Sequence, residues 1–155
     1  MNKKIKTITL CASVSFYEHA IAIANELEAA GFEVLLPDIA NKMRADPTFS
    51  AENYKQAYQK RKDILEKNRL IVGHFAKVRK GEAILVINDQ KHGIPGYIGG
   101  NVLMEMTVAY IFKKPIFVLN PISHKLSVKD EVLGLRPTIL QGSLQDLLNA
   151  NYILA

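Results

Sequence analysis

Apolar residues along the chain gather in five short runs, separated by longer segments of mixed or polar character. Runs of this length, rich in branched aliphatic residues and bounded by turn residues, indicate β-strands. The third run is almost continuously apolar, which is typical of a strand at the centre of a parallel sheet. The five strands are expected over Ile5–Leu10, Phe32–Leu36, Glu82–Ile87, Ile116–Leu119 and Thr138–Leu140.

Helical periodicity fills most of the chain between these strands. Apolar residues recur at three- and four-residue spacing from Phe16 to Ala30, and Gly31 follows as a C-terminal stop. Ser50 is expected to cap a long helix that runs to about Phe75. Further helices are expected from the glycine turn at Gly99 to near Lys113, and from Ser143 to Asn149, whereas 38–49 and 120–136 are expected to be irregular.

This alternation of strands and helices defines the expected fold class. It predicts a doubly wound, flavodoxin-like or Rossmann-like α/β fold, in which a five-stranded parallel sheet carries helices on both faces. The 155 residues suffice for a single domain over 1–155, and 48% hydrophobic and 23% charged residues are ordinary values for a soluble globular protein. No apolar run approaches the roughly 20 residues of a membrane span, so we expect no membrane partner.

Cysteine and histidine usage gives little support to a metal or redox function. Cys11 is the only cysteine, so an internal disulfide and a cysteine-based zinc site are both excluded, which fits a reducing cytoplasm. We interpret Cys11 as a small buried residue at a strand end. The four histidines show no ligand spacing; His74 is interpreted as a helix-end residue, and His92 as a surface residue or an acid in its loop. We therefore expect no metal and no cofactor.

Positive charge is concentrated in one part of the chain. The net charge is +5, and nine Lys or Arg stand between Tyr54 and Lys80 against only Asp63 and Glu66. A basic surface of this kind could attract anionic ligands such as nucleotides, or it could be an ordinary solvated helix face. Nucleic-acid binding is less favoured, because no recognised module accompanies the basic residues.

Glu105 is the strongest candidate for chemistry. It is the only strongly polar side chain between Val102 and Phe112, in a helix expected to be buried all round, directly after a glycine-rich turn. The helix dipole would favour its ionised form, while burial would raise its pKa. Such a carboxylate can act as a nucleophile or a base. The alternative is a helix-start glutamate that complements the dipole or pairs with a lysine.

Other polar residues are expected at the same edge of the sheet. The first and third strands of a doubly wound sheet are often neighbours, with the ligand site beyond their carboxyl ends. That arrangement would bring Ser13 and Ser15 opposite Asp89 and the Gly99–Gly100 turn, where hydroxyls and free amides suit a phosphate or a sugar. Asp89 could hold substrate hydroxyls or protonate a leaving group, or it could be a turn residue. The glycines match neither a dinucleotide fingerprint nor a P-loop.

These motifs resemble the nucleoside 2-deoxyribosyltransferase superfamily, which includes deoxynucleoside 5′-monophosphate N-glycosidases. The resemblance rests on Ile8–Ser13, Gly31–Val34, Ala83–Asn88 and above all Gly99–Ala109, where Glu105 and Ala109 match the family's helix motif. It implies that Glu105 attacks the anomeric carbon of a nucleoside or its 5′-monophosphate and that Asp89 assists base departure. It also implies a homodimer or larger assembly in which Asn120 serves the adjacent protomer. The expected substrate-binding residues are Ser13, Ser15, Phe16, Asn88, Tyr97, Gly99, Gly100, Asn101 and Asn120.

The chain departs from the family's pattern at a few positions, and other functions stay open. Ala12 stands where a glycine is typical, and only Glu82 supplies an acid just before the third strand. A phosphoribohydrolase of the cytokinin-activating type would need a threonine where Val102 stands. A nucleotide sensor would bind its ligand in the same pocket without turnover. A nucleic-acid-associated protein would instead use the basic Tyr54–Lys80 region.

Overall fold

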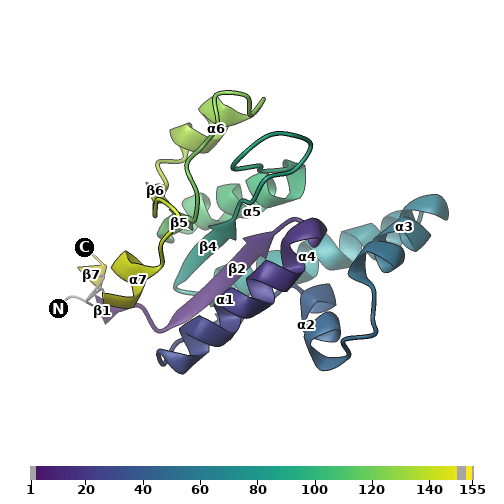
Figure 1. Ribbon diagram of the computed structural model, residues 1–155, viewed down its shortest axis with the longest axis horizontal. Coiled ribbons are helices and arrows are strands. Elements are labelled where there is room, and N and C mark those ends of the chain that lie inside the picture. The colour runs from purple at the N-terminus through teal and green to yellow at the C-terminus, as the bar shows by residue number, and fades with distance from the viewer. Residues whose placement is uncertain (1–2, 150–152, 155) are drawn as a thin grey trace.

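The computed structural model describes residues 3–149 and 153–154 and contains a five-stranded, entirely parallel sheet (Figure 1). The strand order is β3-β2-β4-β5-β6, so the first long strand lies beside the third and the chain crosses over between them. This order confirms the doubly wound α/β class. The strands are β2 (Thr7–Ala12), β3 (Glu33–Leu35), β4 (Ala83–Ile87), β5 (Ile116–Val118) and β6 (Thr138–Ile139). Two short strands, β1 (Lys3–Lys4) and β7 (Ile153–Leu154), pair antiparallel and bring the ends of the chain together.

Helices cover both faces of the sheet, as the sequence predicts (Figure 1). Successive side chains of a strand point to opposite faces. In β4, Leu85 and Ile87 join the core under α1 (Tyr17–Ala29), whereas Ile84 and Val86 join the core under α4 (Ile64–Lys80) and α5 (Gly100–Ile111). The remaining helical elements are η1 (Val14–Phe16), α2 (Asp38–Ala45), α3 (Ala51–Lys60), α6 (Lys129–Gly134) and α7 (Gln145–Asn149).

The expected long helix from Ser50 to Phe75 is two helices. The hydroxyl of Ser50 accepts a hydrogen bond from the Asn53 amide (3.1 Å), so the expected cap is present. Lys62 then adopts a positive φ of 53°, which ends α3, and the Asp63 carboxylate starts α4 by accepting from the Glu66 amide (3.0 Å). An Asp cap inside an apparently continuous periodic pattern is the signal that separates α3 from α4.

Two segments expected to be irregular contain helices. The 38–49 segment forms α2, which Pro37 precedes at the N-cap position and which ends before Asp46. Pro37 and Pro47 both lie just outside this helix, where proline is tolerated. The 120–136 segment contains α6.

The Glu105 helix is not buried all round, contrary to its apolar sequence. Met104 is 40% exposed, Tyr110 51% and Ile111 67%, on the side of α5 that faces away from the sheet. On the neighbouring α4, Leu65 and Val72 are also exposed. We call these side chains, together with Ile64 and Phe112, the α4–α5 apolar face. Within the described residues, no helix combines the length and apolar character needed to cross a bilayer.

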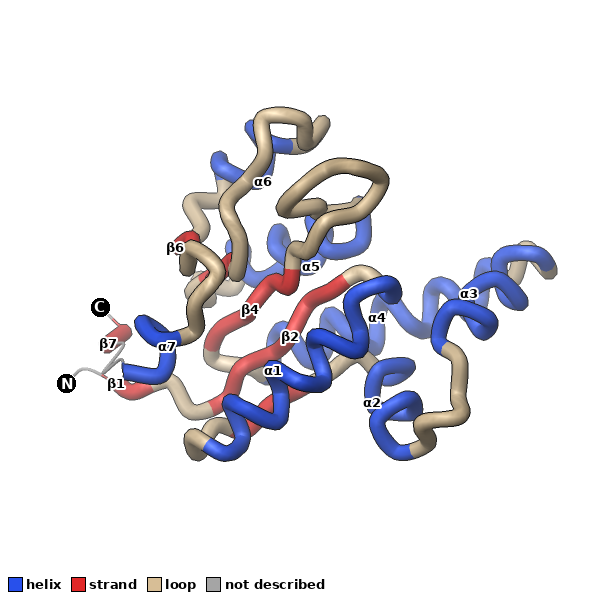
Figure 2. Tube along the Cα trace, in the orientation of Figure 1, coloured by secondary structure: helices blue, strands red, loops and turns tan. Residues whose placement is uncertain are grey.

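The loops that follow β4 and β5 lie side by side above the sheet (Figure 2). The amide of Asn120 donates to the Asn88 side-chain oxygen (2.8 Å), and the Asn88 side-chain nitrogen donates to the Asn120 carbonyl (2.9 Å). Gly96 has a φ of +65°, and a Cβ at this position would overlap the carbonyl oxygen of Pro121. Close backbone approach therefore fixes the glycine loop that leads into α5.

Candidate active site

A cavity of about 310 Å³ opens at the carboxyl ends of β2 and β3. Its walls come from the start of α1, from α2, α3 and α4, and from the N-terminal turn of α5. This is the edge of the sheet at which open parallel folds bind ligands. Among the lining residues are Ser13, Tyr17, Asp38, Tyr58, His74, Tyr97, Gly99, Gly100, Asn101 and Glu105.

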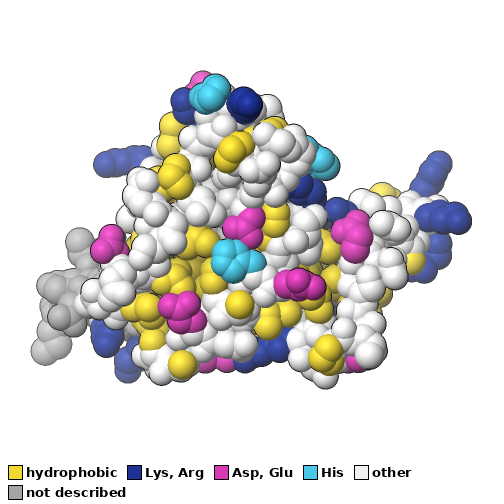
Figure 3. Space-filling model, viewed as in Figure 1, with side chains coloured by type: hydrophobic (Ala, Val, Ile, Leu, Met, Phe, Trp, Pro, Cys, Tyr) yellow, Lys and Arg dark blue, Asp and Glu magenta, His cyan; other side chains and the backbone are white. Residues whose placement is uncertain are grey.

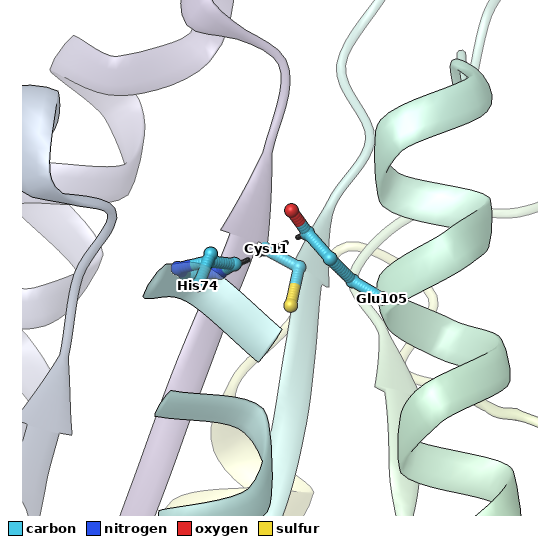
Figure 4. Close-up of side chains that lie close together, drawn as sticks. All are labelled: Cys11, His74 and Glu105. Carbon is cyan, nitrogen blue, oxygen red and sulfur yellow. Dashed lines mark ion pairs between the residues drawn. The ribbon is translucent and has the colours of Figure 1, made fainter. Parts of the chain in front are cut away.

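Glu105 lies in the second turn of α5 and points toward α4 (Figure 4). Its side chain is 12% exposed, and its Oε2 atom is buried without a hydrogen-bond partner among the residues described. Burial raises the pKa of Glu105 to about 8, against smaller opposing effects of Cys11 and Lys67. At neutral pH the side chain is therefore mostly a neutral carboxylic acid.

His74 faces Glu105 from α4, with its Nε2 atom 3.7 Å from the Glu105 Oε2 atom (Figure 4). The ring is 6% exposed, and neither of its nitrogens has a hydrogen-bond partner in the described part of the chain. Burial, aided by the charge of Lys77, lowers the pKa of His74 to about 4. A neutral imidazole therefore stands beside a neutral carboxylic acid.

Cys11 completes this buried cluster from β2. Burial, and then the neighbouring Glu105, raises the pKa of the Cys11 thiol, so it stays protonated. One donor atom each from Cys11, His74 and Glu105 lies within 4.8 Å of the others. This spacing would also admit a soft metal ion, which would be held by the deprotonated thiol and carboxylate together with the imidazole.

Tyr17 and Asp38 are cavity residues that the sequence analysis did not single out. Tyr17 is 8% exposed, and burial followed by the nearby Glu105 raises the pKa of its hydroxyl, which remains a donor. The Asp38 carboxylate pairs with the Lys77 ammonium, which also donates to the Leu36 carbonyl (2.7 Å) and lowers the pKa of Asp38. Asp38 directly follows Pro37 just after the second strand, and this position at a strand end could have marked it as a candidate site residue.

The structure brings some of the expected site residues together. Ser13, Tyr97, Gly99, Gly100 and Asn101 line the same cavity as Glu105. Ser15 instead borders a shallower depression next to α3, and Phe16 is buried in the core under α1.

Three other expected residues lie outside the cavity wall. Asp89 shares a 2.7 Å hydrogen bond with the His19 ring of α1, on the opposite face of the sheet from α4 and α5. Asn88 and Asn120 bind each other and join the two loops. Asp38 is therefore the carboxylate that shares the cavity wall with Glu105, whereas Asp89 does not line the cavity.

Comparison with known proteins supports the fold. The chain aligns with the solved structure of the 2-deoxyribosyltransferase from the psychrotolerant bacterium Bacillus psychrosaccharolyticus, a biocatalyst for the synthesis of antiviral and antitumoral nucleosides. The alignment has a TM-score of 0.59 and 12% identity, and it covers 94% of this chain and 93% of the other. No protein-family model matches the sequence, and no curated protein does so either. The two proteins thus share an α/β architecture over nearly their whole lengths.

Proposed function

We propose that this protein cleaves or transfers the N-glycosidic bond of deoxynucleosides or their 5′-monophosphates, with Glu105 as the nucleophile. The observation that carries this proposal is the placement of Glu105, a buried carboxyl without a hydrogen-bond partner for Oε2 in the described structure, at the wall of a cavity suited to a small molecule. The similarity of fold to a 2-deoxyribosyltransferase supports the same chemistry.

In the proposed reaction the ionised form of Glu105 attacks: with a pKa of about 8, Glu105 gives up its proton to solvent, and His74, with a pKa of about 4, stays neutral. A carboxylate oxygen then forms a bond to C1′ of the sugar, while the bond from C1′ to the base breaks and its electron pair leaves with the base. The departing base takes up a proton. Water or a second base next attacks C1′ and releases Glu105, which gives hydrolysis or transfer.

The remaining polar groups of the cavity are suited to hold the sugar and the base. The Tyr17 hydroxyl and the Ser13 hydroxyl face the cavity, and the backbone amides at the start of α5 are available to sugar or phosphate oxygens. Asp89 stays a secondary candidate for assisting base departure, because its loop also supplies Tyr97 to the cavity wall.

The test is intact mass spectrometry of the protein mixed with deoxynucleosides and deoxynucleoside monophosphates, beside Glu105→Ala. We expect free base and a deoxyribosyl adduct on the parent protein, and neither with Glu105→Ala. The loss in rate of base release should be about a thousandfold or more, as for removal of a covalent nucleophile. Base release by Glu105→Ala at the parent rate would contradict the proposal. Asp130→Asn, on exposed α6, serves as the matched control for loss of one carboxylate.

A second function is a nucleotide sensor that binds without turnover. The observation in its favour is the neutral state of Glu105 at pH 7, in which the carboxyl group can donate a hydrogen bond but cannot attack. Binding of a nucleoside or nucleotide with no base release at any pH between 6 and 9 would support this function over the first.

We further propose that the protein is a homo-oligomer. The α4–α5 apolar face, with Ile111 67% and Leu65 83% exposed, is the surface that a second copy would cover.

A further inference from the structure

Three lysines from different parts of the chain line the cavity: Lys55 of α3, Lys67 of α4 and Lys91 of the glycine loop. Each is half-buried, unlike Lys60 and Lys62 at the exposed end of α3. Lys77 and Lys80 contact the carboxylates of Asp38 and Glu33, but no described carboxylate lies within ion-pair distance of the three cavity lysines. The cavity therefore gathers three ammonium groups that are not neutralised by direct pairing.

These ammonium groups lie close enough to repel one another. Burial, followed by the charge of Lys55, lowers the pKa values of both Lys67 and Lys91. The acidic side chains that oppose this effect are Glu105 near Lys67 and Glu52 near Lys91. Glu105 is mostly uncharged at neutral pH, so it provides little compensation. Crowded, partly desolvated cations are unfavourable alone and become favourable when a multivalent anion lies between them.

Other donors converge on the same space. The Lys91 ammonium donates to the Ser13 hydroxyl (3.0 Å) and lies 5.6 Å from the Tyr97 ring, which holds its stem against the cavity wall. The α5 helix has Gly99 as its N-cap residue and therefore no side-chain cap, and Gly100 and Asn101 in its first turn line the cavity. Uncapped amides at the positive end of a helix favour anions.

Figure 3 shows Lys and Arg side chains gathered at the end of the molecule where α3 protrudes in Figure 1. The α3 helix carries the first part of the basic Tyr54–Lys80 region, whereas Lys77 and Lys80, in the last turn of α4, pair with Asp38 and Glu33. The cavity beside it, at about 310 Å³, is at the small end of ligand pockets and suits one mononucleotide better than a polymer.

We propose that Lys55, Lys67 and Lys91 bind the 5′-phosphate of a nucleoside monophosphate, so that the protein selects nucleotides over free nucleosides. This inference rests on the proposed function, since it assigns the substrate class of the same cavity. The lysines bind the phosphate dianion, and Glu105 faces the sugar to which that phosphate is attached.

The experiment measures calorimetric binding to Glu105→Gln, which keeps the cavity but removes the nucleophile. The titrants are the four deoxynucleoside 5′-monophosphates, the matching deoxynucleosides and inorganic phosphate. We expect at least one monophosphate to bind with a Kd about tenfold or more below that of its nucleoside, and inorganic phosphate to compete with it. Adding Lys67→Gln or Lys91→Gln should remove most of this preference, while Lys60→Gln should leave it in place. Lys60 is the matched control because it removes the same charge from the neighbouring α3 but lies outside the cavity wall.

Two results would overturn the inference: equal affinity for nucleoside and monophosphate, or an equal loss of preference in Lys60→Gln. The second result would assign the effect to general surface charge. An oligonucleotide that binds as tightly as the monophosphate would also overturn it, in favour of nucleic acid. If Lys67→Gln fails to fold, Lys91→Gln in the loop provides the same test.

Turnover by the parent protein separates this inference from the proposed function. Base release at equal kcat/KM from nucleosides and monophosphates would overturn the inference and leave the proposed function standing. A preference for binding monophosphates without any base release would support the inference and contradict the proposed function.

Discussion

At the scale of single residues, the cluster of Glu105, His74 and Cys11 places three titratable groups in a largely buried position at the cavity wall. Burial moves the pKa of the acid up and the pKa of the imidazole down, so both are neutral near pH 7. The neutral state minimises the cost of burying the groups. The charge needed for attack is therefore generated only when Glu105 loses its proton.

The first prediction concerns stability against pH. The pKa of Glu105 is about 8 in the folded protein and about 4.3 in an unfolded chain, so the folded state binds the extra proton between these values. The parent protein should therefore lose stability as pH rises from about 4.5 through 8. Glu105→Gln has no such proton, so its stability relative to the parent should rise over this range, by about 5 kcal/mol at most.

Thermal unfolding of both proteins at pH 5 and pH 9 provides the measurement. We expect the Tm of Glu105→Gln relative to the parent to be several degrees higher at pH 9 than at pH 5. The low pKa of His74 affects both proteins and largely cancels in the difference. A Tm difference that does not change with pH would show that Glu105 is ionised in the folded protein.

Glu105 could be found from the sequence because a single acid in an apolar helix is locally visible. His74 and Tyr17 could not, because their proximity to Glu105 depends on how α4 and α1 pack against the sheet. Nothing in the local pattern around His74 distinguishes a residue that faces an acid across two helices from an ordinary helix residue. The same is true of Asp38, because the helix that it begins lies in a segment that was expected to be irregular.

At the scale of elements, the glycine loop between β4 and α5 sets the position of the Glu105 helix. The strand before it and the helix after it could be predicted from apolar patterning, and their bounds agree closely with the expected ranges. The division of α3 from α4 was not predicted, because both helices share a basic and apolar periodicity that is continuous across Lys62, and only the Asp63 cap marks the start of α4. The contact of this loop with the loop after β5 was not predicted either, because it joins residues that are far apart in the sequence.

The second prediction compares two glycines of this loop. Gly96→Ala adds a Cβ at a positive φ and against the Pro121 carbonyl, so it should destabilise the protein by about 3 kcal/mol. Gly93→Ala also has a positive φ (71°), but no atom lies within 4 Å of its added Cβ, and it should cost only about 1 kcal/mol.

Urea unfolding of the two variants measures this difference directly. We expect the midpoint of Gly96→Ala to fall well below that of Gly93→Ala with an unchanged m-value. Equal midpoints would mean that the two loops separate easily and that the Pro121 contact does not hold the start of α5.

At the scale of the whole molecule, the sheet divides the protein into two cores and leaves one apolar surface uncovered. The fold class, the number of strands and the adjacency of the first and third strands could all be predicted from the sequence. The exposure of Met104, Tyr110 and Ile111 could not, because an apolar helix looks the same in sequence whether its outer side faces a core or a partner.

The third prediction concerns the oligomeric state. Sedimentation velocity should show a particle with at least twice the mass of one chain. Ile111→Lys, which places a charge in the α4–α5 apolar face, should shift it toward the monomer. Because Ile111 is 67% exposed, the substitution should change the stability of the monomer by less than about 1 kcal/mol.

Lys113→Glu, at an exposed residue just beyond α5, is the control for a change of charge near the same helix. A parent protein that sediments as a monomer at micromolar concentration would contradict the prediction. In that case the apolar face is covered by another kind of molecule or by none.

Of the lysines proposed to recognise phosphate, Lys67 shares α4 with His74, whereas Lys55 and Lys91 stand on parts of the chain that carry none of the groups in the reacting cluster. Glu105 and Cys11 are set in α5 and β2, which belong to the packed interior, whereas Lys55 stands on α3 at the protruding end of the molecule (Figure 1). An ancestral gene could therefore have altered α3, and with it the substrates accepted, while leaving the reacting centre intact. A change in α3 would alter substrate specificity without altering the residues proposed to react. We therefore expect α3 to be the segment in which relatives of this protein have diverged most.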